Sequence, residues 1–160
     1  MARFGKILLN LKPKRLQRRL LAAASISLLC AAEVLAALAG DLASVGHDTA
    51  AFGASASQTP LGTETVYTQT LSNGLLVRQY VDARGLVFAV AWEGPVLPDF
   101  ERLLGTAFQT YALAVRQQKR GVTIQTPDLV IESGGMMRSF AGRAYLPAKL
   151  PPNLTAKDIR

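Results

Sequence analysis

The chain has 160 residues, a formal net charge of +7 and an isoelectric point near 10. Seven of its eighteen lysines and arginines lie before residue 20, whereas residues 37–160 carry eleven cations and ten acids. This nearly neutral remainder lacks the clustered positive charge that phosphate neutralisation requires, so the composition argues against a nucleic-acid partner.

The first 36 residues have the three parts of a secretory signal peptide. The basic stretch is followed by an apolar run from Leu20 to Ala32, and Val34-Leu35-Ala36 then fits the small-x-small cleavage rule. Glu33 interrupts the apolar run before it reaches the ~20 residues of a membrane span. We therefore expect cleavage after Ala36, no stable membrane span afterwards, and export to the periplasm or the extracellular space.

The expected mature chain has no cysteine and only one histidine. The only cysteine, Cys30, lies within the signal peptide, which leaves no disulfide, thiol nucleophile or thiolate metal site. His47 is the sole histidine, and one imidazole cannot supply the usual set of metal ligands. The sequence therefore predicts no metal and no cofactor, and it singles out no catalytic residue.

The mature chain begins with a segment of low complexity. Residues 37–60 are rich in alanine, glycine and serine, and we expect them to be flexible or to form a short helix capped by Asp41. Residues 61–147 have the patterning of an α+β domain. The prolines from residue 147 onward then predict an extended C-terminal tail over residues 148–160.

Three strands are predicted at the start of the domain. Thr65–Leu71 and Leu75–Val81 flank Asn73-Gly74, the preferred pair for a two-residue hairpin turn, which would set Leu71 opposite Leu76. The third strand, Leu86–Trp92, is apolar on both faces. Such a strand is typical of the middle of a sheet.

A helix and two more strands follow. Pro98-Asp99 begins a helix whose apolar residues recur every three or four positions, and basic residues end it before Gly121. Two strands, Asp128–Ser133 and Met137–Leu146, then surround a turn that we expect at Gly134-Gly135. The predicted fold is therefore α+β, with an antiparallel sheet of about five strands and one long helix packed on one face.

Two groups of side chains are candidates for a functional site. Aromatic and arginine side chains dominate recognition sites, and those available here at strand ends and on the last strand are Trp92, Arg138, Arg143 and Tyr145. Arg143 and Tyr145 share a face of that strand, whereas Arg138 has the opposite parity. Glu93 and Glu132 are weaker candidates, as an acid and base pair of the glycosidase kind.

Several strings in the domain are similar to those of a known family. They are Val87-Phe88-Ala89-Val90-Ala91-Trp92-Glu93-Gly94-Pro95, Leu97-Pro98-Asp99, Leu103-Leu104-Gly105, Glu132-Ser133-Gly134-Gly135 and the run from Met137 to Pro147. In these strings the chain resembles the bacterial domain-of-unknown-function family 2844, which implies an exported, uncharacterised protein and assigns no catalytic residue.

Three functions fit these observations. The first is a non-enzymatic binding or accessory protein of the cell envelope, which holds an envelope or secreted protein partner through a sheet edge or the aromatic and arginine set. The second is a carboxylate-dependent envelope hydrolase that uses Glu93 and Glu132. The third is a periplasmic carrier that holds a small ligand between helix and sheet.

Overall fold

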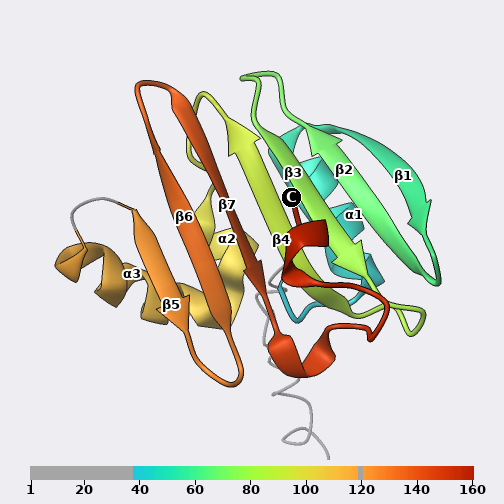
Figure 1. Cartoon of the computed structure of the whole chain (residues 1–160). Helices are drawn as coiled ribbons and strands as arrows, with labels where there is room; N and C mark the ends of the chain where they lie inside the picture. The colour runs from blue at the N-terminus through green and yellow to red at the C-terminus, as the bar shows by residue number, and fades with distance from the viewer. Residues whose placement is uncertain (1–37, 119–120) are drawn as a thin grey trace, which may run out of the picture. The chain divides into compact units, whose positions relative to one another are not determined.

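The computed structural model describes residues 38–118 and 121–160 of the chain. All of them belong to the unit Glu33–Arg160, which is organised around one antiparallel sheet (Figure 1). The predicted signal peptide, residues 1–36, lies outside the described residues. None of the helices formed by the described residues has the length and apolar character needed to cross a membrane.

Within the described residues the sheet has seven strands in the order β1-β2-β3-β4-β7-β6-β5, and neighbouring strands are antiparallel. The strands are β1 Ser55–Leu61, β2 Glu64–Thr70, β3 Leu76–Val81, β4 Val87–Gly94, β5 Val122–Gln125, β6 Val130–Met136 and β7 Ser139–Tyr145. The helices are α1 Leu42–Phe52, α2 Phe100–Leu104, η1 Gly105–Ala107, α3 Phe108–Gln117, η2 Pro147–Lys149 and η3 Ala156–Asp158. The prediction of an α+β fold with an antiparallel sheet is confirmed.

The predicted count of about five strands is wrong, because the sheet has two further strands at its edges. β1 is almost wholly exposed and reads Ser-Ala-Ser-Gln-Thr-Pro-Leu, so it lacks the apolar alternation by which a half-buried strand is recognised. It pairs along its whole length with β2. At the other edge, β5 has only four residues. Edge strands bury little surface, which explains why their sequences carry a weak signal.

The single long helix is also a wrong prediction. Asp99 caps α2 by accepting a hydrogen bond from the backbone N–H of Arg102 at 3.2 Å, as expected for a helix that begins here. However, Gly105 adopts φ 51° and ψ −121°, which ends α2 after five residues. The chain continues as a 3-10 turn and then as α3, so the apolar stripe is shared by two short helices with different axes.

The first hairpin has a different register from the predicted one. Its loop has three residues, because the backbone N–H of Leu71 donates to the carbonyl of Leu75 at 2.9 Å and Gly74 takes a positive φ of 83°. Thr70 therefore lies opposite Leu76, which moves the predicted pairing by one residue. A three-residue loop that ends in a left-handed glycine is a common alternative to the two-residue turn.

The second hairpin turns three residues later than predicted. Its turn residues are Met137 and Arg138, with φ of 53° and 67°, and the ladder closes immediately before them with Met136 opposite Ser139. Gly135 instead lies inside β6, where a Cβ atom would collide with the facing backbone of β7. Gly135 thus permits the close approach of β7, and the left-handed turn positions are taken by two residues with side chains.

The two faces of the sheet are covered by different parts of the chain. Helices α1, α2 and α3 pack on one face over a core that includes Val77, Trp92, Leu103 and Ile131 (Figure 1). The C-terminal segment, residues 147–160, lies on the other face and contains η2 and η3. Its Leu154 and Ile159 pack with Tyr80, Ala89 and Ala91 in a second buried cluster. The central position of β4 is confirmed, because it contributes side chains to both clusters.

A buried polar cluster lies between α1 and the sheet. The Gln79 amide donates to the Asp48 carboxylate at 3.1 Å, while the Gln69 amide donates to the Thr49 hydroxyl at 2.7 Å and to the carbonyl of Val45 at 3.1 Å. Asp48 is only 2% exposed. Burial raises the pKa of Asp48 from 3.8 to about 6, and the hydrogen bond from Gln79 offsets part of this effect.

Candidate functional site

A groove of about 420 Å³ lies on the face of the sheet opposite the helices. It runs across β4, β7, β6 and β5 beside the end of the C-terminal segment. Its lining combines residues with small or no side chains, hydroxyl groups and charged groups: Gly134, Ala141, Gly142, Thr123, Ser133, Glu93, Glu132, Arg143 and Arg160. It also includes three buried apolar residues, Trp92, Val122 and Ile159. The small residues expose the backbone of the strands at the floor of the groove, and the charged side chains form its walls.

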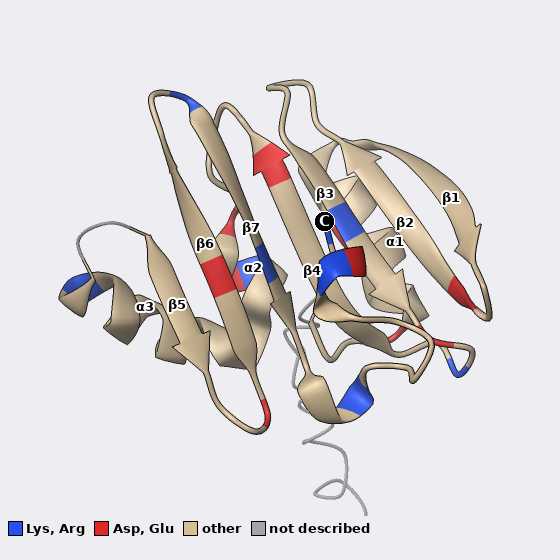
Figure 2. Ribbon diagram, viewed as in Figure 1, with Lys and Arg blue, Asp and Glu red and all other residues tan. Residues whose placement is uncertain are grey.

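Glu132 and Arg143 form an ion pair in the groove. These residues lie directly opposite each other on β6 and β7. The guanidinium donates a hydrogen bond to the carboxylate from Nε at 2.8 Å, and its Nη2 lies 2.6 Å from the same carboxylate oxygen in the ion pair. Figure 2 shows the acidic position of β6 beside the basic position of β7. The two side chains are 38% and 26% exposed, so the pair faces solvent while its geometry is held by the sheet.

Arg143 also connects the groove to the C-terminal segment. Its Nη1 donates to the backbone carbonyl of Ala156, and to that of Ile159 at 3.4 Å. Beside it, the hydroxyl of Tyr80 donates to the carbonyl of Arg160 at 2.9 Å and accepts from its N–H at 3.0 Å. These hydrogen bonds hold the segment against the sheet and leave Arg160 on the wall of the groove.

A second ion pair borders the groove on β3 and β4. Arg78 Nη2 donates to Glu93 at 2.8 Å, and the Glu93 side chain is 55% exposed. Glu93 and Arg160 also line a neighbouring hollow of about 440 Å³ over β1, β2 and β3. The two hollows therefore meet at Glu93 and Arg160, and an extended ligand could pass from one to the other.

The structure brings two of the four sequence-predicted recognition residues, Trp92 and Arg143, to the lining of the groove, whereas Arg138 and Tyr145 are not part of it. Trp92 is 1% exposed and packs edge-on against Phe100, with ring centroids 5.2 Å apart, in the core under the helices. Its indole Nε1 has no hydrogen-bond partner within the described part of the chain. Arg138 lies at the tip of the β6–β7 hairpin. Tyr145 shares a face with Arg143, as predicted, but packs against the second buried cluster.

The two predicted acid and base candidates do line the same groove. Glu93 is on β4 and Glu132 on β6, with β7 between them, so their backbones are roughly 10 Å apart across the sheet. Each carboxylate forms an ion pair with an arginine, Glu93 with Arg78 and Glu132 with Arg143.

The sequence patterns did not indicate Thr123, Ser133 and Arg160 as residues of the groove, or Arg78 as a residue of the neighbouring hollow. The alternation along β3 already separates Arg78 from the core residues of its strand, which is a usable signal. The place of Arg160 depends on the packing of the C-terminal segment, which no local pattern in the sequence encodes.

A further hollow of about 850 Å³ lies on the helix-covered face, between α1 and the first two strands. Its lining is largely apolar and includes Leu42, Val45, Gly46, Ala50 and Tyr67. His47 is exposed on the same helix and belongs to neither groove nor hollow. Among residues 38–118 and 121–160, no three histidine, cysteine, aspartate or glutamate side chains gather as a metal site would require.

The fold and its groove define a class: a small α+β protein with one seven-stranded antiparallel sheet, helices on one face and a charged groove on the other. Within that class, the chain belongs to the family described as "Protein of unknown function (DUF2844)", whose model matches residues 34–159. This match confirms the resemblance noted in the sequence. Comparison with curated proteins and with solved structures found no match for the chain.

Proposed function

We propose that this chain is an exported, non-enzymatic accessory protein of the cell envelope, which binds a protein partner in the groove on the helix-free face. Export is supported by the signal-peptide pattern of residues 1–36. Binding is supported by one structural observation: a solvent-facing ion pair, Glu132–Arg143, stands in a groove with a floor of small residues. A polypeptide segment can lie on such a floor and exchange hydrogen bonds with both charges.

The groove is prepared for binding before the partner arrives. Arg143 is held by Glu132 and by two backbone carbonyls, so its guanidinium loses little rotational freedom when a ligand carboxylate or carbonyl contacts it. Glu132 keeps unoccupied acceptor positions for a cationic or amide donor. The pair can therefore recognise donors and acceptors on one segment without rearrangement.

Filling the groove should abolish partner binding and leave the fold intact. Ala141 is exposed on β7, opposite Glu93 and Gly134, and makes no side-chain hydrogen bond that its replacement would remove. In Ala141→Trp the indole would occupy the space that the partner needs. A partner that cross-links to the tagged wild-type chain in the soluble envelope fraction should be recovered about tenfold less with tagged Ala141→Trp, as for a blocked interface centre.

Ala83→Trp serves as the matched control, because Ala83 is also an exposed alanine but lies in the turn between β3 and β4, outside the groove and the two hollows. Quantitative mass spectrometry of the cross-linked material, with thermal unfolding of each variant, distinguishes the surfaces. Equal capture by wild type and Ala141→Trp would rule out the groove. Loss with Ala83→Trp alone would move the partner to the turn between β3 and β4, and recovery of the chain only from the cytosol would refute export.

The hollow beneath α1 favours a second candidate function, a carrier of a small apolar ligand. Its volume lies within the range of ligand pockets, and its lining is mostly apolar with the Thr49 hydroxyl as a polar group. Gly46 borders this space, and a Cβ atom built on it meets no atom within 4 Å. A larger side chain here would enter the hollow without straining the protein.

Gly46→Leu should therefore evict a bound small molecule while strengthening the helix. Leucine favours helix over glycine by roughly 0.5–1 kcal/mol, so a loss of ligand could not be attributed to unfolding. Native mass spectrometry of protein isolated from its own envelope is expected to show an added small mass that Gly46→Leu removes and Ala43→Leu, on the exposed side of α1, retains. If all three chains carried the same added mass, or none, the carrier function would be excluded.

A further inference from the structure

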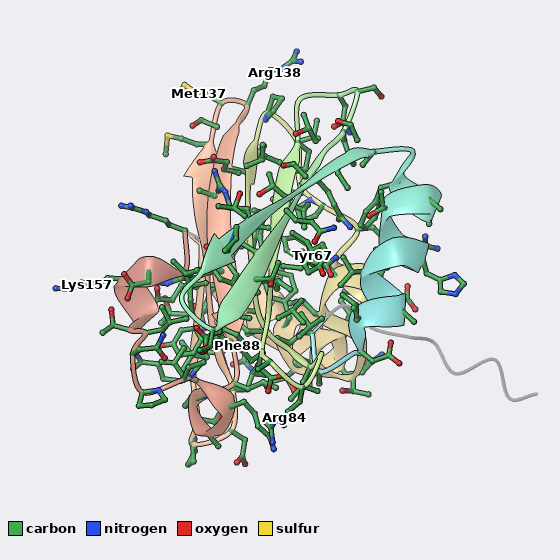
Figure 3. All side chains as sticks on the ribbon, turned by 90° about the vertical axis from the view of Figure 1, so that its right-hand side faces the viewer. Tyr67, Arg84, Phe88, Met137, Arg138 and Lys157 are labelled. Atoms are coloured by element: carbon green, nitrogen blue, oxygen red, sulfur yellow. The ribbon has the colours of Figure 1, made fainter. Side chains whose placement is uncertain are left out.

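The tip of the β6–β7 hairpin exposes apolar side chains. Met136 and Met137 are 68% and 91% exposed, the two highest values among the large hydrophobic residues of the described chain. Figure 3 shows Met137 and Arg138 projecting together at one end of the sheet, with Arg84 at the opposite end. The loop after β4 reaches the same end as the tip and carries Leu97, which is 49% exposed.

The backbone of this tip is strained by the residues that occupy it. A two-residue turn with both residues at positive φ favours asparagine and glycine, because side chains with a Cβ atom crowd the backbone in this conformation. Here Met137 and Arg138 occupy both positions, although Gly134 and Gly135 are only a few residues away. As a result, the thioether of Met137 and the guanidinium of Arg138 lie at the end of the hairpin.

Arg138 is the only charged residue of the tip Met136–Arg138. Arg138 takes part in none of the ion pairs among the described residues, and no aspartate or glutamate occurs in the sequence between Glu132 and Asp158. Glu132 lies further along β6 and is paired with Arg143, and Glu93, which faces Ala141 from β4, is paired with Arg78. Apolar side chains beside this arginine match the boundary between acyl chains and anionic head groups.

We propose that the tip Met136–Arg138 inserts into the surface of an anionic phospholipid bilayer. The two methionine side chains enter the acyl region, and Arg138 binds lipid phosphates. Since the ladder closes at Met136 and Ser139, only the two turn residues bring backbone outside the sheet into this region. The contact is independent of the groove, so it would place a partner-binding surface beside a membrane without requiring a span.

A fluorescent label next to the tip tests the proposal in the full chain. Cys30→Ser removes the only native thiol, and Ser139→Cys or Ala83→Cys then places an NBD label beside the tip or in the turn at the opposite end. With vesicles of phosphatidylcholine and phosphatidylglycerol, we expect the Ser139→Cys label to brighten about threefold and shift to the blue. The Ala83→Cys label should not respond, and pure phosphatidylcholine should give a weaker signal.

Residues 1–36 are common to both labelled chains, so membrane binding through them would affect the two labels alike. Adding Met137→Asn and Arg138→Gly installs preferred turn residues, which should raise the unfolding temperature while abolishing the vesicle signal. Equal responses at both ends, or a signal that survives this double change, would overturn the proposal. A label silent on vesicles but responsive to soluble envelope protein would overturn it too, by assigning the tip to a protein partner.

Discussion

Replacing Asp48 by asparagine is expected to stabilise the protein at neutral pH by up to about 3 kcal/mol. The carboxyl group is buried beneath α1, and its pKa of about 6 shows that the fold favours the neutral form. Asparagine has nearly the same shape, carries no charge and still accepts the hydrogen bond from Gln79.

The sign of the pH dependence follows from the direction of this shift. Because the pKa of Asp48 is higher in the folded chain than the usual 3.8, the unfolding free energy should fall as pH rises from about 4 to about 6. Hydrogen bonds from Thr63 and Thr155 lower the pKa values of Glu64 and Asp158, so these carboxyl groups act in the opposite direction and at more acidic pH.

Urea unfolding of the wild type and of Asp48→Asn between pH 4 and pH 7 measures both effects. The two chains should be similarly stable near pH 4 and should diverge as the pH rises, with the variant nearly insensitive to pH across this range. A wild-type stability that rises over the same interval, or a variant less stable at pH 7, would show that Asp48 is ionised and favourably bound in the folded chain.

Gly142→Ala is expected to destabilise the fold by about 3 kcal/mol or more, the upper part of the range for overpacking. A Cβ atom on Gly142 would collide with the Trp92 ring and with the backbone carbonyl of Glu132. Trp92 is fixed between the sheet and Phe100, so neither neighbour can withdraw without breaking core packing or sheet hydrogen bonds. The emission of Trp92, the only tryptophan, should shift to the red as its packing loosens.

Gly134→Ala provides the control on the adjacent strand. Gly134 lies opposite Ala141 in the same sheet, but a Cβ atom there would meet nothing within 4 Å. Its unfolding free energy should stay within about 0.5 kcal/mol of the wild type, as for a surface substitution. If both alanine variants lost the same stability, the cost would come from strand glycines in general and the close contact with Trp92 would not be the cause.

The sequence alone determined the elements whose evidence is local. Asn73-Gly74 placed a hairpin, Asp99 marked the start of a helix, and the apolar run of β4 indicated a strand covered on both faces. Each of these depends on turn chemistry, capping or periodicity, which act within a few residues. The family strings could also be read directly, because they require no knowledge of which residues meet in space.

Tertiary structure decided the register of β6 and β7. The local preference for glycine would place the turn at Gly134-Gly135, yet the strands align Ile131 with Ala144 in the core and set Gly142 against Trp92. Burying a side chain such as isoleucine yields about 1.5–3 kcal/mol, whereas the strain of the observed turn costs about 1–2 kcal/mol per residue. Several buried contacts act together along the strand, so packing overrides the local preference.

The candidate site was predictable only in part for the same reason. The sequence identified Arg143, Glu93 and Glu132 as individual candidates, and the sheet brought them to one groove because β4, β7 and β6 are neighbours in space. The sequence also made Trp92 a candidate. A strand that is apolar on both faces does not show which face its tryptophan takes, and in the structure Trp92 lies in the core under the helices. Residue types and local patterns are written in the chain, whereas the choice of face and partner depends on contacts between distant strands.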